Sequence, residues 1–146
     1  MSSSRFAVAV HVLALQALSP EVPLTSAYLA GSVSTNPVVV RRLLALLAEA
    51  GLVTTTPGPH GGARLARPAA GITLADVLAA VEEDGLLTLH KSPPNPKCPV
   101  GRNIEGVLSG LFVEAERALS KTLERTTIDD VAKAISKCLK TNPLKS

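Results

Sequence analysis

Apolar residues recur at helical spacing through the first fifty positions, with one clear interruption. Residues 5–18 are rich in valine, leucine and alanine, and they predict a first helix that is too short to cross a bilayer. A short second helix is expected next, with Thr25 or Ser26 capping its N-terminus. Turn-forming residues at 31–36 break the pattern, and Pro37 suits the first turn of a third helix. Two helices joined by a tight turn form the helix-turn-helix pattern.

The third predicted helix combines an apolar face with a polar start. Apolar residues at positions 40, 43, 44, 47 and 48 should be buried, and Gly51 should end the helix. Arg41 and Arg42 lie near its start, where a recognition helix meets base edges and phosphates in the major groove. The alternative is a solvated helix with two ordinary surface arginines. The DNA-binding candidates in this segment are Thr25, Ser26, Ser34, Thr35, Asn36 (also the expected cap), Val40, Arg41 and Arg42.

The spacing of apolar residues changes after the third helix. Residues 52–56 are β-branched and predict a strand, residues 57–62 predict a turn, and the alternation at 63–67 predicts the returning strand. A hairpin directly after a recognition helix is typical of a wing, although a plain surface hairpin is the alternative. The wing candidates are His60, Gly61, Gly62 and Arg64, since glycines let the backbone approach phosphate closely.

Helical spacing returns in the second half of the chain. Thr73 and Asp76 have the spacing of a capping box and begin a helix that ends by residue 84. Four prolines mark the segment 85–103 as a loop, and a long helix is expected over 104–125, followed by a last helix capped by Thr126 or Thr127 and a basic tail within 126–146.

The long helix carries an apolar stripe whose members alternate by four and three positions, as in a coiled coil. We expect this stripe to form a dimer, because a symmetric operator needs two readers, although packing within one chain is the alternative. The dimer candidates are Ile104, Val107, Leu108, Leu111, Phe112, Ala115 and Leu119. The predicted fold is mainly α with a small β-hairpin: a winged helix-turn-helix domain over 1–84 plus a dimerisation helix.

The charge distribution supports a nucleic-acid partner. The chain has 146 residues and a net charge of +3, and residues 1–68 hold five arginines against two glutamates, so the whole excess lies in the half with the helix-turn-helix. Aromatic residues make up only 2%, too few for stacking on single strands, so duplex DNA is the expected partner. We find no signal peptide and no membrane span, and two cysteines cannot form a disulfide framework, so a cytoplasmic setting is expected.

Enzymatic motifs are missing from the pattern. We find no nucleotide-binding loop, no metal-ligand cluster and no paired nucleophile and base at readable spacing, so we predict that the protein is not an enzyme and needs no cofactor. The alternative function is a protein-interaction module without specific DNA binding. Salt-dependent affinity for duplex would separate the two functions, because only phosphate binding releases counterions.

The order of elements, with NPVVVRRLLALLAEAGLV in the helix-turn-helix and GG-x-x-LAR-P-x-x-x-ITLADVL-x-AVE after it, resembles the Rrf2 family of winged-helix regulators, which includes IscR-like and NsrR-like proteins. The resemblance covers most of the chain. It implies a homodimer that binds a palindromic operator, usually as a repressor. Ala63 departs from the family pattern, because members usually carry an aromatic residue after the paired wing glycines.

The loop after the winged domain differs from that of the family's cluster-binding members. Those members carry three closely spaced cysteines that hold an iron–sulfur cluster, whereas this loop has Cys98 alone, in a PNPKCPVG setting similar to that of cluster-free relatives. We therefore expect no cluster. Cys98 is the candidate sensing residue, because Lys97, Arg102 and a following helix N-terminus would favour its thiolate. A lone cysteine that serves only as a small apolar residue is the alternative.

Overall fold

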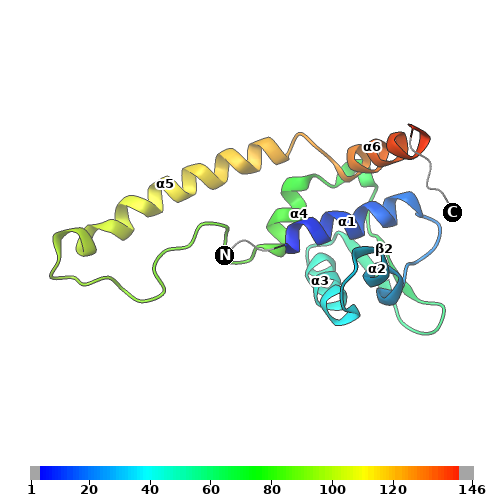
Figure 1. The fold of residues 1–146 in the computed structure, drawn as a ribbon, viewed down its shortest axis with the longest axis horizontal. Helices are drawn as coiled ribbons and strands as arrows, with labels where there is room; N and C mark the ends of the chain where they lie inside the picture. Colours follow the sequence, from blue (N-terminus) through cyan, green and yellow to red (C-terminus); the bar gives the residue numbers. More distant parts are fainter. Residues whose placement is uncertain (1–3, 142–146) are drawn as a thin grey trace.

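Six helices and one two-stranded hairpin make up residues 4–141, which the computed structural model describes. In chain order these are α1 (Arg5–Leu18), α2 (Ser26–Val33), α3 (Pro37–Glu49), β1 (Val53–Thr56), β2 (Gly62–Leu65), a 3-10 turn (Ala69–Gly71), α4 (Leu74–Val81), α5 (Pro99–Leu123) and α6 (Ile128–Thr141). Figure 1 shows one domain built around α1, from which α5 projects as an arm. The expected class, mainly helical with a small hairpin, is confirmed.

Local capping fixes the helix-turn-helix. Thr25 begins α2, since its hydroxyl accepts the Tyr28 N–H at 3.1 Å, so Thr25 rather than Ser26 is the cap. Asn36 begins α3 in the same way, with its side-chain oxygen accepting the Val38 N–H at 2.8 Å. The expected break at 31–36 is shorter in the structure, because α2 continues to Val33 and the left-handed turn is made by Ser34 at a φ of 66°.

The hairpin is tied to the helix-turn-helix by a third stretch of backbone. Leu24, just before α2, exchanges two hydrogen bonds with Ala63 in β2, at 2.9 and 2.8 Å. Gly62 lies beside this contact at a φ of 149°, and a Cβ there would meet the backbone of Leu24. The hairpin is therefore held at a fixed angle to α2 and α3. Its second strand ends at Leu65, two residues earlier than the sequence pattern predicts.

The core lies between α1 and the helices around it. Val12 and Leu13 of α1 are fully buried together with Leu29 of α2 and Leu47 of α3. Ile128, at the start of α6, belongs to the same core and is also fully buried. Residues 126–146 were expected to form a separate C-terminal segment, but α6 packs along α1 and shares its core. Residues 142–146 of the expected tail lie outside the described residues.

Two capping boxes stand side by side at the starts of α4 and α6. The expected pair Thr73 and Asp76 is confirmed, with reciprocal hydrogen bonds of 3.0 Å. Thr127 and Asp130 form the second box, at 2.9 and 3.1 Å, so Thr127 rather than Thr126 is the cap of α6. Backbone hydrogen bonds join the two starts, including one of 2.9 Å from the Ile128 N–H to the Ile72 carbonyl.

The arm, α5, begins five residues earlier than expected. Pro99 was read as a helix breaker, but it occupies the first turn, where its missing N–H costs no hydrogen bond, and Cys98 precedes it as the N-cap residue. The C-terminal part of α5 packs against α4, while the N-terminal part extends away from the domain (Figure 1). Glu116 fixes the start of the loop 85–98, because its Oε1 accepts the N–H groups of Leu86 and Leu87 at 3.1 and 3.2 Å.

Candidate nucleic-acid interface

The predicted recognition helix, α3, divides into a buried face and an exposed face. Leu43, Leu44 and Leu47 face the core as the sequence predicts, and so does Val40, which is 0% exposed. Val40 was proposed as a DNA contact, and this prediction is wrong, because a side chain without exposed surface cannot reach a base. The exposed face instead carries Val38, Val39, Arg41, Arg42 and Ala45.

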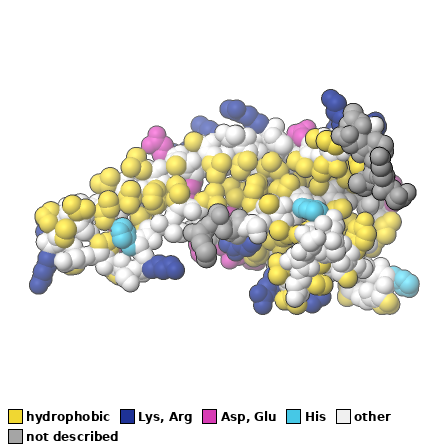
Figure 2. Space-filling view, in the orientation of Figure 1, with side chains coloured by type: hydrophobic (Ala, Val, Ile, Leu, Met, Phe, Trp, Pro, Cys, Tyr) yellow, Lys and Arg dark blue, Asp and Glu magenta, His cyan; other side chains and the backbone are white. Residues whose placement is uncertain are grey.

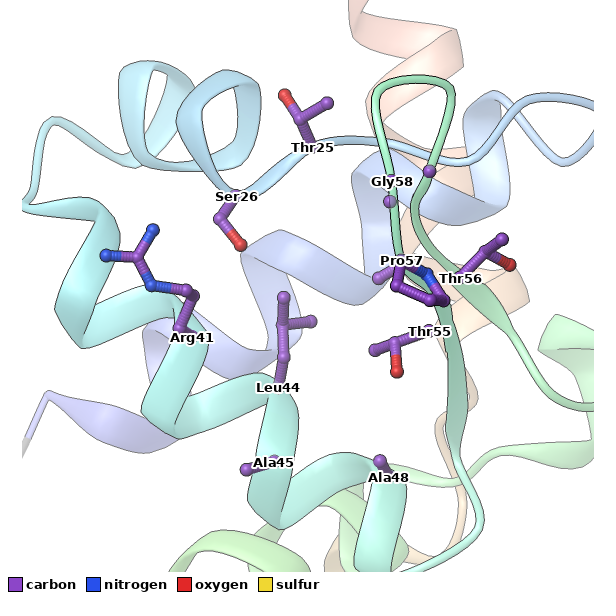
Figure 3. Close-up of a pocket in the computed structure, with 13 residues that line it drawn as sticks. Thr25, Ser26, Arg41, Leu44, Ala45, Ala48, Thr55, Thr56, Pro57 and Gly58 are labelled. Atoms are coloured by element: carbon purple, nitrogen blue, oxygen red, sulfur yellow. The ribbon is translucent and has the colours of Figure 1, made fainter.

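A groove of about 560 Å³ separates α3 from the hairpin. Its walls come from α3, from the start of α2 and from hairpin residues 55–58 and 61–63. Figure 3 shows Arg41 rising from α3 beside Ser26, with Thr55, Thr56 and Pro57 on the opposite side. The structure therefore brings three of the sequence candidates, Thr25, Ser26 and Arg41, to one groove together with the wing.

Arg42 points to the other side of α3. It lines a separate groove of about 500 Å³ between α3 and the start of α1, together with Arg5, Val8 and Val39. The two adjacent arginines are thus divided between the two flanks of the helix. Their side chains therefore do not line the same groove.

The wing residues serve different purposes. His60 and Arg64 are exposed, but Arg64 alternates with the buried Ala63 along β2, so its side chain lies on the hairpin face away from the groove. Gly61 is buried and donates its N–H to the Gly58 carbonyl at 3.0 Å. The prediction that Gly61 offers its N–H to phosphate is therefore wrong. Its glycine is needed because a Cβ would collide with the Thr56 carbonyl.

The remaining turn candidates lie between α2 and α3. Ser34 is exposed in its left-handed conformation. Thr35 is half-buried, and its N–H is donated to the Ala30 carbonyl at 3.0 Å. Asn36 is exposed, but its side-chain oxygen is occupied by the cap of α3. These residues shape the turn, and only their outward polar atoms remain for DNA.

Comparison with known proteins identifies the family. The sequence profile of the Rrf2 family, described as iron-dependent transcriptional regulators, matches residues 2–134. The chain belongs to the Rrf2 family. YwnA of Bacillus subtilis (strain 168), named as a candidate HTH-type transcriptional regulator, is 41% identical over 132 residues, which span 90% of this chain and 96% of YwnA. The protein is therefore a DNA-binding transcriptional regulator and not an enzyme.

Solved structures agree with this assignment. A crystal structure of a candidate DNA-binding protein is 38% identical, with a TM-score of 0.68 over 88% of this chain and 98% of that chain. A candidate transcriptional regulator from Lactobacillus plantarum is 26% identical, with a TM-score of 0.76 over 94% of this chain and 93% of that chain. Among the helices within residues 4–141, none is long and apolar enough to span a membrane.

Iron, which the Rrf2 description implies, does not fit the residues of this chain. Within residues 4–141, no three His, Cys, Asp or Glu side chains come together as a metal site. Cys98 lies at the outer end of the arm, whereas Cys138 lies on α6 at the other end of the molecule (Figure 1). Protein-held iron–sulfur clusters normally use four ligands, most of them thiolates, and the described residues do not supply them.

Cys98 is exposed at the N-terminus of α5. The backbone N–H groups of Gly101 and Val100 lower the pKa of its thiol, because they point toward the sulfur and stabilise the thiolate, even though no full capping hydrogen bond forms. The expected contributions of Lys97 and Arg102 are not the cause. The geometry thus favours the thiolate. The sequence predicted the contribution of the helix N-terminus, and the two neighbouring basic side chains were not needed.

The sequence interpretation missed two residues on the exposed face of this Rrf2 protein. Val38 and Ala45 are apolar and were not considered as DNA contacts, yet both are exposed on α3. The helical period could have indicated their exposure. Val38 lies nine positions before the buried Leu47, so Val38 is on the opposite side of the helix.

Proposed function

We propose that this protein is a homodimeric repressor that binds a palindromic operator. The observation that carries the proposal is the uncovered apolar stripe of α5. Val107 and Leu111 are 60% and 55% exposed, and no residue of this 25-residue helix is buried. Figure 2 shows hydrophobic side chains along the projecting arm and over the adjoining upper part of the domain.

A second copy of the chain is the natural cover for this stripe. A helix of this length is about 37 Å long, so apolar side chains that recur along it form an elongated exposed patch, and such patches mark interaction sites. Two copies of one stripe can cover each other about a two-fold axis, because an isologous interface pairs the same residues twice. The alternation by four and three positions is the spacing with which helices interlock. All seven predicted interface residues lie on α5 and remain exposed or half-buried.

Dimer symmetry determines the form of the operator. A two-fold dimer presents two copies of α3, which favours inverted half-sites about one or more helical turns apart, roughly 34 Å for one turn. Thr25, Ser26 and Arg41 would contact DNA from the groove side, while His60 and Arg64 would contact the flanking backbone. Repression is what the resemblance to the family implies, and it would follow from an operator that overlaps the site of RNA polymerase.

Selection and footprinting test the proposal together. Genomic fragments bound by the purified protein are sequenced, and one bound duplex is footprinted and sedimented with the protein. We expect an inverted repeat, two protomers per duplex and an affinity that falls steeply with salt. A single protomer on an asymmetric site would contradict the dimeric function, and salt-independent binding would contradict the phosphate contacts. Transcription in vitro from the selected promoter should fall as protein is added, and a rise would make the protein an activator.

Cys98 is the site at which we propose redox control. Hydrogen peroxide would transfer one oxygen atom to the Cys98 thiolate, giving the sulfenic acid and hydroxide. Support comes from the exposure of the thiol and the lowered pKa at the start of α5. Peroxide should change operator affinity in the parent protein and leave the Cys98→Ser variant unchanged. Equal responses of the two proteins, or none, would place the signal elsewhere.

A further inference from the structure

The outermost line of the recognition helix is apolar. With about 100° per residue, Val38 and Ala45 lie about 20° apart around the axis of α3, directly opposite the buried Leu47. Both are exposed, Val38 by 43%. Glu49 shares this line but is the last residue of α3, farthest from the N-terminal end that recognition helices present to bases.

The two arginines flank this line. Arg41 lies about 60° to one side of Val38 and Arg42 about 40° to the other. Their surroundings agree with these angles, since Arg41 lines the groove toward the hairpin and Arg42 the groove toward α1. Ala45 lines both grooves and therefore lies on the ridge between them.

A helix in the major groove meets different parts of DNA at its centre and at its flanks. The groove is about 12 Å wide, close to the diameter of a helix with its side chains, so the outermost line faces the base edges and the flanks face the two phosphate walls. Valine and alanine cannot form hydrogen bonds with a base. Their apolar counterpart in the major groove is the C5-methyl group of thymine.

We propose that Val38 and Ala45 read thymine methyl groups at the centre of each half-site, while Arg41 and Arg42 bind the phosphates on either side. This specificity rests on the proposed role of α3 as the recognition helix. It assigns base readout to two apolar residues and positioning to the arginines, the reverse of what the residue types alone suggest.

The test removes methyl groups from the DNA without changing its base pairing. Random duplexes of about 30 base pairs, or three helical turns, are selected with the parent protein, and one bound duplex is resynthesised with deoxyuridine at single thymidine positions. Uracil pairs as thymine does but lacks the C5-methyl group. At a contacted position, affinity should fall about fourfold, which is the 0.8 kcal/mol of one buried methyl converted at 1.4 kcal/mol per factor of ten.

The deoxyuridine substitutions are then combined with a change in the protein. Val38→Ala removes the proposed contact, and Val39→Ala is its matched control. The two valines are adjacent and almost equally exposed, at 43% and 44%, but Val39 lines the groove toward α1. Val38→Ala should weaken binding to the thymidine duplex and make one deoxyuridine substitution neutral. Val39→Ala should leave the full deoxyuridine effect in place. An effect that came from a change in DNA shape would persist in Val38→Ala as well.

Two other results would overturn the inference and differ in what they leave standing. If deoxyuridine has no effect anywhere, while 7-deazaguanine lowers affinity in the parent and not in Arg41→Ala, then α3 reads guanine through arginine and the proposed function survives. If Val38→Ala, Arg41→Ala and Arg42→Ala all bind the selected duplex like the parent, then α3 does not read DNA, and both this inference and the assigned recognition helix fail.

Discussion

The dimer can be tested by placing one charge in the apolar stripe of α5. Leu111 lies in the middle of the helix and is 55% exposed in the single chain. Leu111→Glu should therefore leave the protomer folded, because the glutamate can remain in water. In the dimer the same side chain would be buried, once in each protomer.

The size of the effect follows from the surface that the dimer would cover. Full burial of a leucine stabilises by about 1.5–3 kcal/mol, so covering the exposed half of two copies contributes roughly 2–3 kcal/mol. Loss of this term alone raises the dimer dissociation constant at least about 30-fold. Burial of two unpaired carboxylates adds several kcal/mol, which moves the expected rise toward a thousandfold or more.

Val113→Glu is the matched control for this experiment. Val113 is 53% exposed, close to Leu111, but it lies about 160° away around α5 and outside the stripe. Sedimentation equilibrium of both variants over a concentration series, with circular dichroism to verify folding, measures the contrast. An intact dimer in Leu111→Glu, or equal dissociation of the two variants, would show that the stripe is not the interface.

Three other residues give simpler predictions. Arg64→Ala should weaken binding to operator and random duplex alike and reduce the salt slope by about one, and a loss confined to one operator position would mean that Arg64 reads a base. Because the pKa of the Cys98 thiol lies below its ordinary value, alkylation by iodoacetamide in a Cys138→Ser background should reach half its maximal rate at lower pH in the folded than in the urea-unfolded protein. Gln16 is buried with no hydrogen-bond partner for its amide atoms within the described structure, so Gln16→Met should raise the free energy of unfolding in urea by about 1–3 kcal/mol, and a decrease would show that the amide is satisfied.

Local chemistry explains which parts of the fold the sequence could predict. The caps Thr25, Asn36 and Thr73 need only their own neighbours in the chain, so their helices begin where the pattern places them. Proline is less decisive, because it breaks a helix in the interior but begins one in the first turn. Pro37 was read correctly beside a capping asparagine, whereas Pro99 followed three other prolines and was assigned to the loop.

The parts that could not be predicted depend on contacts distant in sequence. Ile128 is an apolar residue at a helix start, and nothing nearby in the chain indicates that it completes the core around α1. The reason for a glycine at position 61 is also a distant contact. A Cβ there would collide with the Thr56 carbonyl across the hairpin, so the glycine is not explained by a ligand. Val40 differs, because its helical phase already predicts burial, and that phase excludes it from the DNA-facing side although it lies near the helix start.

The position of Cys98 limits how a signal could reach the recognition helices. Cys98 lies at the outer end of the arm, while α3 lies in the domain at the other end (Figure 1). Within one described chain, the arm joins the domain through its packing on α4 and through the hydrogen bonds of Glu116 to the loop. A change at Cys98 can therefore reach α3 by two routes. It can displace α5 where that helix packs on α4, or it can alter the contact with a second protomer. Leu111→Glu would separate the two routes, because it should remove the second protomer of the proposed dimer and leave the packing of α5 on α4 intact. If peroxide still shifts the affinity of this monomeric variant for a single half-site, the signal travels through α5 itself, and a response confined to the dimer would place the switch at the interface.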